Sequence, residues 1–151
     1  MVTDVLVKTQ LSNAMAEDFA RDLRQDGILE EKIQVQVQRS KDRINSAPVV
    51  VLLCLDMSEM DSYPDARRQQ AEWTMAMQSV AAAGLQLLLG AHAEGLAGVW
   101  VCSPLFTQEI IQKTLRLPEA WEPQGMFFLG YADGLPKHKE MKPLQGVLKW
   151  V

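Results

Sequence analysis

The sequence has only two cysteines and two histidines among its 151 residues. Two cysteines are too few for the disulfide framework of small secreted domains, and no cluster of Cys and His has the spacing of a zinc site. The sequence therefore predicts no metal site. Cys54 and Cys102 each lie in an apolar run, and the favoured interpretation is two buried, reduced thiols in a cytoplasmic protein.

An excess of positive charge is also missing. The sequence has 15 Lys and Arg residues against 19 Asp and Glu residues, for a formal net charge of -4, which disfavours a nucleic-acid-binding protein. The first residues show no basic region followed by an apolar core, so no secretory signal is predicted. Residues 74–93 contain no charged residue, but polar side chains such as Gln78 and Gln86 interrupt them. We therefore expect a buried helix here rather than a membrane span.

Apolar residues, in contrast, are abundant. They make up 48% of the chain, which is enough to build the core of a single domain over residues 1–151. Helical patterns come first in the sequence, and apolar runs typical of buried strands then alternate with further helical patterns. This order of elements predicts an α/β (α+β) fold in which a mixed sheet packs against a long central helix.

The first part of the chain predicts two helices. Asp4 is a suitable N-cap, the apolar residues that follow recur every four residues, and Gly27 is a plausible helix stop. In the next segment Ile33, Val35 and Val37 alternate as in a strand, while other apolar positions fit one face of a helix. We favour a helix because this segment is rich in Glu, Gln, Lys and Arg.

Three apolar runs predict strands, at residues 49–55, 99–102 and 125–131. The first two have the continuous apolar character of strands buried on both faces. Between them a long helix is expected from about Pro64 to Glu94, with apolar residues on nearly all sides, so we expect it to be buried almost all round. Its run Ala81-Ala82-Ala83-Gly84 would let another helix approach closely. A short helix capped by Thr107 is expected before the third strand.

The turn after the second strand is the first candidate binding site. In α/β proteins, ligands tend to bind outside the carboxyl ends of strands. Cys102 and Ser103 occupy such a turn, where backbone N–H groups are free to donate to a ligand carbonyl or ring nitrogen. The alternative is an ordinary connection in which Ser103 satisfies a local cap.

A run of lysines near the end of the chain is the second candidate. Lys139 and Lys142 belong to the segment Lys137-His138-Lys139-Glu140-Met141-Lys142, a local positive patch in an acidic protein. Such a patch could bind a phosphate group. The alternative interpretation is a solvated basic surface.

Together these segments resemble the nitroreductase-like family of FMN-dependent oxidoreductases, and the match covers most of the chain. The motifs that carry it are Ala47-Pro48-Val49-Val50-Val51-Leu52, Met77-Gln78-Ser79-Val80-Ala81-Ala82-Ala83 with Gln86-Leu87-Leu88-Leu89, Gly95-Leu96-Ala97-Gly98-Val99-Trp100, Leu117-Pro118-Glu119-Ala120-Trp121-Glu122-Pro123 and Gly130-Tyr131-Ala132. The closest subgroup is the nitroreductase-like domain of deazaflavin-coenzyme glutamate ligases.

The resemblance implies a homodimer formed through the central helix, with FMN at the subunit interface. It implies NAD(P)H as reductant and a small organic molecule as acceptor. By the resemblance, Cys102 and Ser103 form the turn whose backbone N–H groups face flavin N5 and O4, and Lys139 and Lys142 lie in the tail that contacts the phosphate. It assigns no catalytic side chain to this sequence.

One family motif is missing. The family opens with an Arg-Arg-Ser-x-Arg motif that holds FMN, and here Val2-Thr3-Asp4 resembles the end of the first strand that follows it. The resemblance therefore implies a domain truncated at its N-terminus. A non-catalytic dimeric module that has lost flavin binding is one alternative function. Binding of a deazaflavin or a nicotinamide instead of FMN is another.

Overall fold

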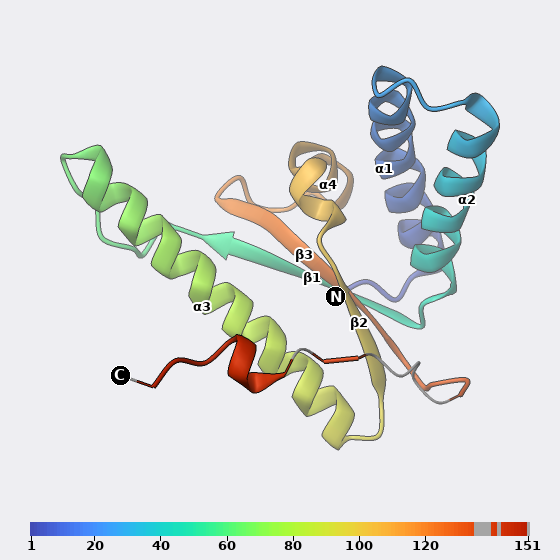
Figure 1. Ribbon diagram of the computed structural model, residues 1–151. Helices are drawn as coiled ribbons and strands as arrows, with labels where there is room; N and C mark the ends of the chain where they lie inside the picture. The colour runs from blue at the N-terminus through green and yellow to red at the C-terminus, as the bar shows by residue number, and fades with distance from the viewer. Residues whose placement is uncertain (135–139, 142, 151) are drawn as a thin grey trace.

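A computed structural model describes residues 1–134, 140–141 and 143–150. The chain begins with a hairpin of two helices, α1 (Val5–Gln25) and α2 (Glu30–Ser46), which stand beside each other in Figure 1. The side chain of Asp4 accepts a hydrogen bond from the Val7 N–H at 2.9 Å and caps α1. Gly27 follows α1 with a φ of 73°, a left-handed conformation that glycine adopts without strain. Both predicted limits of the first helix are confirmed.

The second segment is helical, as favoured. Ile33 and Ile44 are fully buried, whereas Val35 is 69% exposed. Eleven residues are close to three helical turns, so the two isoleucines share one face and Val35 points away from it. The strand-like alternation around Val35 therefore had no structural consequence.

A buried lysine of α1 is hydrogen-bonded to the end of α2. Lys8 of α1 is 5% exposed, and its Nζ donates to the Ala47 carbonyl at 2.7 Å and the Asn45 carbonyl at 3.3 Å. These carbonyls lie at the C-terminal end of α2, where backbone acceptors lack partners within the helix and a positive charge is favourable.

The strands form an antiparallel sheet. Strands β1 (Val49–Asp56), β3 (Trp121–Gly130) and β2 (Ala97–Val101) lie in the order β1-β3-β2 within the described residues. The α+β class and the long helix are confirmed, but the expected mixed sheet is wrong. The crossover from β1 to β2 makes these two strands parallel, and β3 inserts between them and runs opposite to both. Val2 adds an antiparallel bridge to Val50 at the free edge of β1.

The helices cover the two faces of this sheet unequally. In Figure 1, α1, α2 and the short helix α4 (Gln108–Leu115) lie on one side of the sheet, and α3 (Ala66–Ala93) crosses the other side. The hydrophobic core lies on the side of α1, α2 and α4. Its fully or nearly buried members are Leu11, Met15, Ile44, Ala47, Val50, Ile111 and Met126.

The helix α3 has the predicted extent but not the predicted burial. Only Glu72, Ala76 and Gly84 are buried along its described length, because one of its faces lies on the sheet and the opposite face is exposed. A Cβ on Gly84 would lie 2.9 Å from Phe127 Cζ and 3.1 Å from Leu53 Cδ2. The glycine thus admits side chains of the strands, whereas Ala81, Ala82 and Ala83 are exposed.

The outer face of α3 is strongly apolar. Its exposed side chains include Met75 (51% exposed), Leu85 (55%) and Leu89 (60%). In length and composition α3 could cross a membrane, with a mean hydropathy of 1.3 over its most apolar window. The edge strand β2 is also exposed, with Val99 at 53%, so the expectation of burial on both faces is wrong for β2. No described element covers its outer edge.

Candidate functional site

The turn after β2 is built by a proline. Cys102 ends the strand, and a single 3-10 turn follows, η1 (Ser103–Phe106), in which Pro104 is buried. Proline has no N–H to continue a strand ladder and favours the first turn of a helix. The Leu105 N–H donates to the Cys102 carbonyl at 3.1 Å and closes the turn.

Cys102 and Ser103 are both exposed at this turn. The expectation of a buried thiol at Cys102 is therefore wrong, because the turn carries its side chain out of the sheet. Within the described residues, neither the N–H nor the hydroxyl of Ser103 donates a hydrogen bond. The turn thus offers two unused donors at one residue, as the sequence had indicated.

A cavity of about 420 Å³ opens beside this turn. Its lining comes from α1, α2 and the η1 segment: Met15, Phe19, Asp22, Leu23, Asp26, Ser40, Cys102, Ser103, Phe106 and Thr107. A volume of this order with mainly apolar walls and a few polar groups is typical of a small-molecule site. Both residues predicted from the turn lie in this cavity.

The residues that α1 and α2 contribute were missed in the sequence. The stripe of Met15, Phe19 and Leu23 was interpreted as the core face of the first helix. Met15 belongs to the core and also borders the cavity, whereas Phe19 and Leu23 are half-buried and line the cavity alone. No spacing in the sequence could have found Ser40, because it reaches the site only through the packing of α2 against α1.

The acidic groups of the cavity lie toward one end. Asp22 and Asp26 are at the C-terminal end of α1, near the loop that joins it to α2. Asp22 accepts from Arg21 Nη2 at 3.2 Å, whereas no ion pair holds Asp26 among the described residues. This end of the cavity is therefore unfavourable for an anionic group.

Two further polar groups are buried near the turn. Trp100 Nε1 and both polar atoms of the Gln124 side chain are buried without a partner among the described residues. Gly125 lies beneath the indole, since a Cβ there would be 2.4 Å from Trp100 Nε1. The Trp100 ring also packs on Phe127 with centroids 5.1 Å apart. Gly125 is thus required for the position of the tryptophan two residues before Cys102.

The second cysteine has the properties of a structural thiol. Cys54 is half-buried in β1, and burial raises the pKa of its thiol above the ordinary value of 9.0. A raised pKa reduces the thiolate fraction that a nucleophile requires. Cys54 is therefore no candidate for covalent catalysis.

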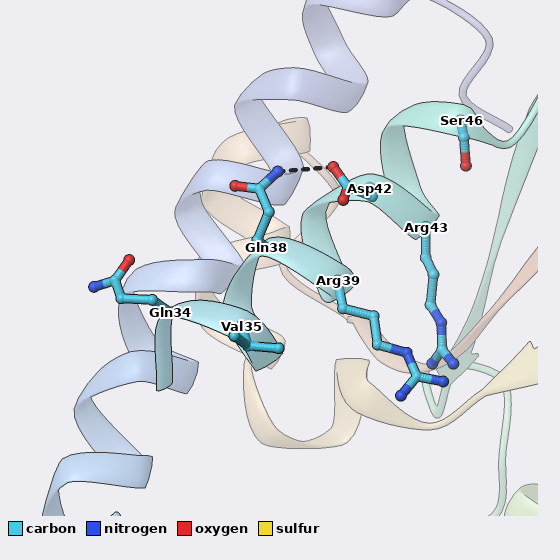
Figure 2. A pocket seen from close by; sticks show the side chains of 7 residues that line it. All are labelled: Gln34, Val35, Gln38, Arg39, Asp42, Arg43 and Ser46. Atoms are coloured by element: carbon cyan, nitrogen blue, oxygen red, sulfur yellow. Dashed lines mark hydrogen bonds between the residues drawn. The ribbon is translucent and has the colours of Figure 1, made fainter. Parts of the chain in front are cut away.

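A second surface, on the exposed side of α2, carries charge. An open groove of about 780 Å³ is lined by Gln34, Val35, Gln38, Arg39, Asp42, Arg43 and Ser46 (Figure 2). Arg39 and Arg43 project from the same side of the helix, and Gln38 Nε2 donates to Asp42 Oδ1 at 2.7 Å. The predicted phosphate ligands Lys139 and Lys142 lie outside the described residues. Arg39 and Arg43 are the cationic residues of this groove.

Comparison with known proteins identifies the family. Residues 1–131 match the model of the nitroreductase family. The chain belongs to this family. The predicted resemblance is confirmed at this level.

Solved structures share the fold at low sequence identity. A BluB-like flavoprotein from Clostridium difficile 630 superposes with a TM-score of 0.78 at 16% identity, over 99% of this chain and 77% of that one. The NfrA1 nitroreductase from B. subtilis gives 0.67 at 15% identity, over 98% and 54%. The NADPH:FMN oxidoreductase from Vibrio harveyi, solved in complex with NAD+, gives 0.64 at 18%, over 99% and 56%. This chain thus spans only about half the length of the last two proteins.

Proposed function

We propose that this chain is a subunit of a homodimeric, FMN-dependent oxidoreductase that NAD(P)H reduces and that passes electrons to a small organic acceptor. The observation that carries the proposal is the cavity at the Cys102–Ser103 turn in a protein of the nitroreductase family. Its apolar walls suit the faces of a flavin ring. The two unused donors of Ser103 suit the polar edge of that ring.

Bound FMN would supply the redox chemistry, which the protein orients and tunes. Phe19 and Leu23 form an apolar wall, and the exposed Phe106 forms another. The N–H and hydroxyl of Ser103 would bind a ring carbonyl or nitrogen, and this contact would fix the ring relative to β2.

The test is flavin uptake by the purified protein. Addition of FMN should give a yellow protein after dialysis, and NADPH or NADH should bleach the visible absorbance of the bound flavin without air. Ser103→Ala should weaken FMN binding by about tenfold or less, since one neutral hydrogen bond is lost and the backbone donor remains. Ser62→Ala, an exposed serine in the loop before α3, is the matched control. Failure of the wild-type dimer to take up FMN would refute the proposal.

The dimer is proposed to form through the outer face of α3. The resemblance to dimeric flavin enzymes supports a second copy as its partner, and the exposed Leu85 and Leu89 give this face the apolar character of a protein interface. Sedimentation at micromolar concentration should show a dimer. Leu89→Gln should shift it toward monomer, while Leu29→Gln, at an equally exposed leucine before α2, should not. Flotation with lipid vesicles instead would show that a membrane covers α3.

A dimeric module without flavin is the alternative function. The observation that favours it is the pair of carboxylates, Asp22 and Asp26, in the cavity, because they repel an anionic cofactor. A dimer that binds neither FMN nor riboflavin would support this alternative.

The choice of cofactor is a finer part of the proposal. The motifs of the sequence also resemble the nitroreductase-like domain of deazaflavin-coenzyme glutamate ligases, so a deazaflavin is the second ligand to test. Separate fluorescence titrations with FMN, a deazaflavin and a nicotinamide coenzyme distinguish these ligands. FMN as the sole flavin-type ligand would exclude the deazaflavin.

A further inference from the structure

Two arginines on α2 make no side-chain hydrogen bond or ion pair with the part of the chain that the structure describes. Arg39 and Arg43 are both exposed and stand about one helical turn apart. No ion pair joins either of them to a carboxylate within the described residues, although the chain has more acidic than basic side chains. Like charges at this spacing destabilise a helix slightly. The pair is thus a feature that stability alone does not explain.

The nearest carboxylate on the helix does not neutralise the pair. Asp42 accepts a hydrogen bond from Gln38 at 2.7 Å, and Figure 2 shows its carboxylate on the side of Gln38, away from both guanidinium groups. The two guanidinium groups therefore keep their donors available to an anion from solution.

Arg39 and Arg43 line the open groove on α2, and on the same helix they flank Ser40, a residue of the cavity at the Cys102–Ser103 turn. Ser40 lines that cavity, and on an ideal helix Arg43 and Arg39 lie roughly 60° and 100° from Ser40, in the same rotational direction. Lys41 lies on the other side of Ser40 and lines a separate groove between α1 and α2. In Figure 2 both arginines extend toward the pale yellow segment that contains β2 and η1.

Along the helix hairpin, the pair is level with the part of the cavity whose lining residues include no carboxylate. The two helices run antiparallel, as the contacts of Lys8 with Ala47 and of Ser12 with Asn45 show. Ser40 is therefore level with the middle of α1, whereas Asp22 and Asp26 lie toward the connecting loop. A ligand with one anionic end would place that end near the arginines.

We propose that Arg39 and Arg43 bind the phosphate monoester of the ligand that occupies the Cys102–Ser103 cavity. This inference rests on the proposed function, which supplies such a ligand. A guanidinium group presents paired N–H donors that match two phosphate oxygens, and two such groups suit a dianionic monoester. The monoester belongs either to the ribityl chain of FMN or to the 2′ position of NADPH. Riboflavin and NADH lack it.

The first experiment compares FMN with riboflavin. Their dissociation constants are measured by fluorescence for the wild-type protein, the Arg39→Gln/Arg43→Gln double variant and the control Arg67→Gln. Arg67 is an exposed arginine on α3 without an ion pair among the described residues. Circular dichroism checks that each variant is folded. The double variant should bind FMN at least about tenfold more weakly and riboflavin unchanged, and its FMN affinity should depend less on salt.

The second experiment identifies the source of the phosphate. If the monoester comes from NADPH, FMN binding is unchanged in the double variant, but the preference of the wild-type protein for NADPH over NADH as reductant of the bound flavin is lost. Unchanged binding of FMN together with an unchanged coenzyme preference would overturn the inference and leave the proposed function intact. Failure of the wild-type protein to bind either flavin would overturn both.

Discussion

On one face of the sheet, α1, α2 and α4 enclose a core of fully buried side chains, whereas on the other face α3 lies alone with an apolar outer surface. Leu11 on the first side is 1% exposed, while Leu89 on α3 is 60% exposed. The first side is completed by contacts within the chain. The second side has the same kind of apolar residues, but on α3 they are exposed. The apolar residues of α1 and of α3 both predict burial. The described chain buries those of α1, whereas those on the outer face of α3 stay exposed.

The largest difference in stability between the two sides is expected when Leu11 and Leu89 are each replaced by alanine. Leu11→Ala leaves a cavity in a closed core and should lower the free energy of unfolding by about 2–5 kcal/mol at any protein concentration. Leu89→Ala should change it by less than about 1 kcal/mol in dilute protein, with a larger effect at concentrations where dimers form. Denaturant unfolding at two concentrations measures both. An equal loss for the two variants in dilute protein would show that the outer face of α3 is already packed.

The next effect concerns the buried amine that joins α1 to α2. Lys8→Met keeps the length of the side chain but leaves the carbonyls of Asn45 and Ala47 without their donor. We expect a loss of about 1–3 kcal/mol, measured by denaturant unfolding. Lys32→Met, at an exposed position on α2, is the control and should be nearly neutral. Equal stabilities of the two variants would mean that the buried amine contributes nothing to the hairpin.

A smaller difference in thermal stability is expected between alanine substitutions on the two faces of α3. Gly84→Ala would bring a methyl group against Phe127 and Leu53, and overpacking of this kind costs about 1–3 kcal/mol. The higher helix propensity of alanine offsets up to about 1 kcal/mol of that cost. Gly90→Ala meets no atom within 4 Å and should stabilise α3 by up to about 1 kcal/mol. Thermal unfolding should therefore move in opposite directions, and a rise in Tm for both variants would contradict the close contact at Gly84.

The smallest effect is a pH dependence at the surface of the hairpin. The Arg24 guanidinium, which binds both oxygens of Glu30, and then Gln34, lower the pKa of Glu30 from 4.5 to about 2. Because the folded state has the lower pKa, the stabilisation from this carboxylate is present above about pH 4.5 and is lost as the pH falls toward 2. The wild type should therefore exceed Glu30→Gln in Tm at pH 7, and the difference should shrink at pH 3.

The salt bridge is exposed, so the difference should be small and should decrease with added salt. Glu31→Gln, at the neighbouring exposed glutamate, is the control. An NMR titration that places the pKa of Glu30 near 4.5 in the folded protein would refute this prediction.

Local sequence signals determined the elements of this protein. Asp4 and Gly27 set the limits of α1, the apolar run from Val49 predicted β1, and the end of the apolar run at Val101 predicted the turn at Cys102 and Ser103. These signals succeed because caps, turns and hydrophobic periodicity act over a few residues. The family motifs extended this local information to the fold class.

Only the tertiary structure decided how the elements meet. Strand order and direction depend on β3 inserting between β1 and β2, which no local pattern encodes. The roles of Gly84 and Ser40 likewise depend on which surface packs against each residue. The sequence by itself thus determined the helices, the strands and the position of the turn at Cys102 and Ser103. The antiparallel sheet, the cavity walls and the uncovered face of α3 follow from long-range packing, because contacts between residues far apart in the chain decide which apolar surfaces are buried.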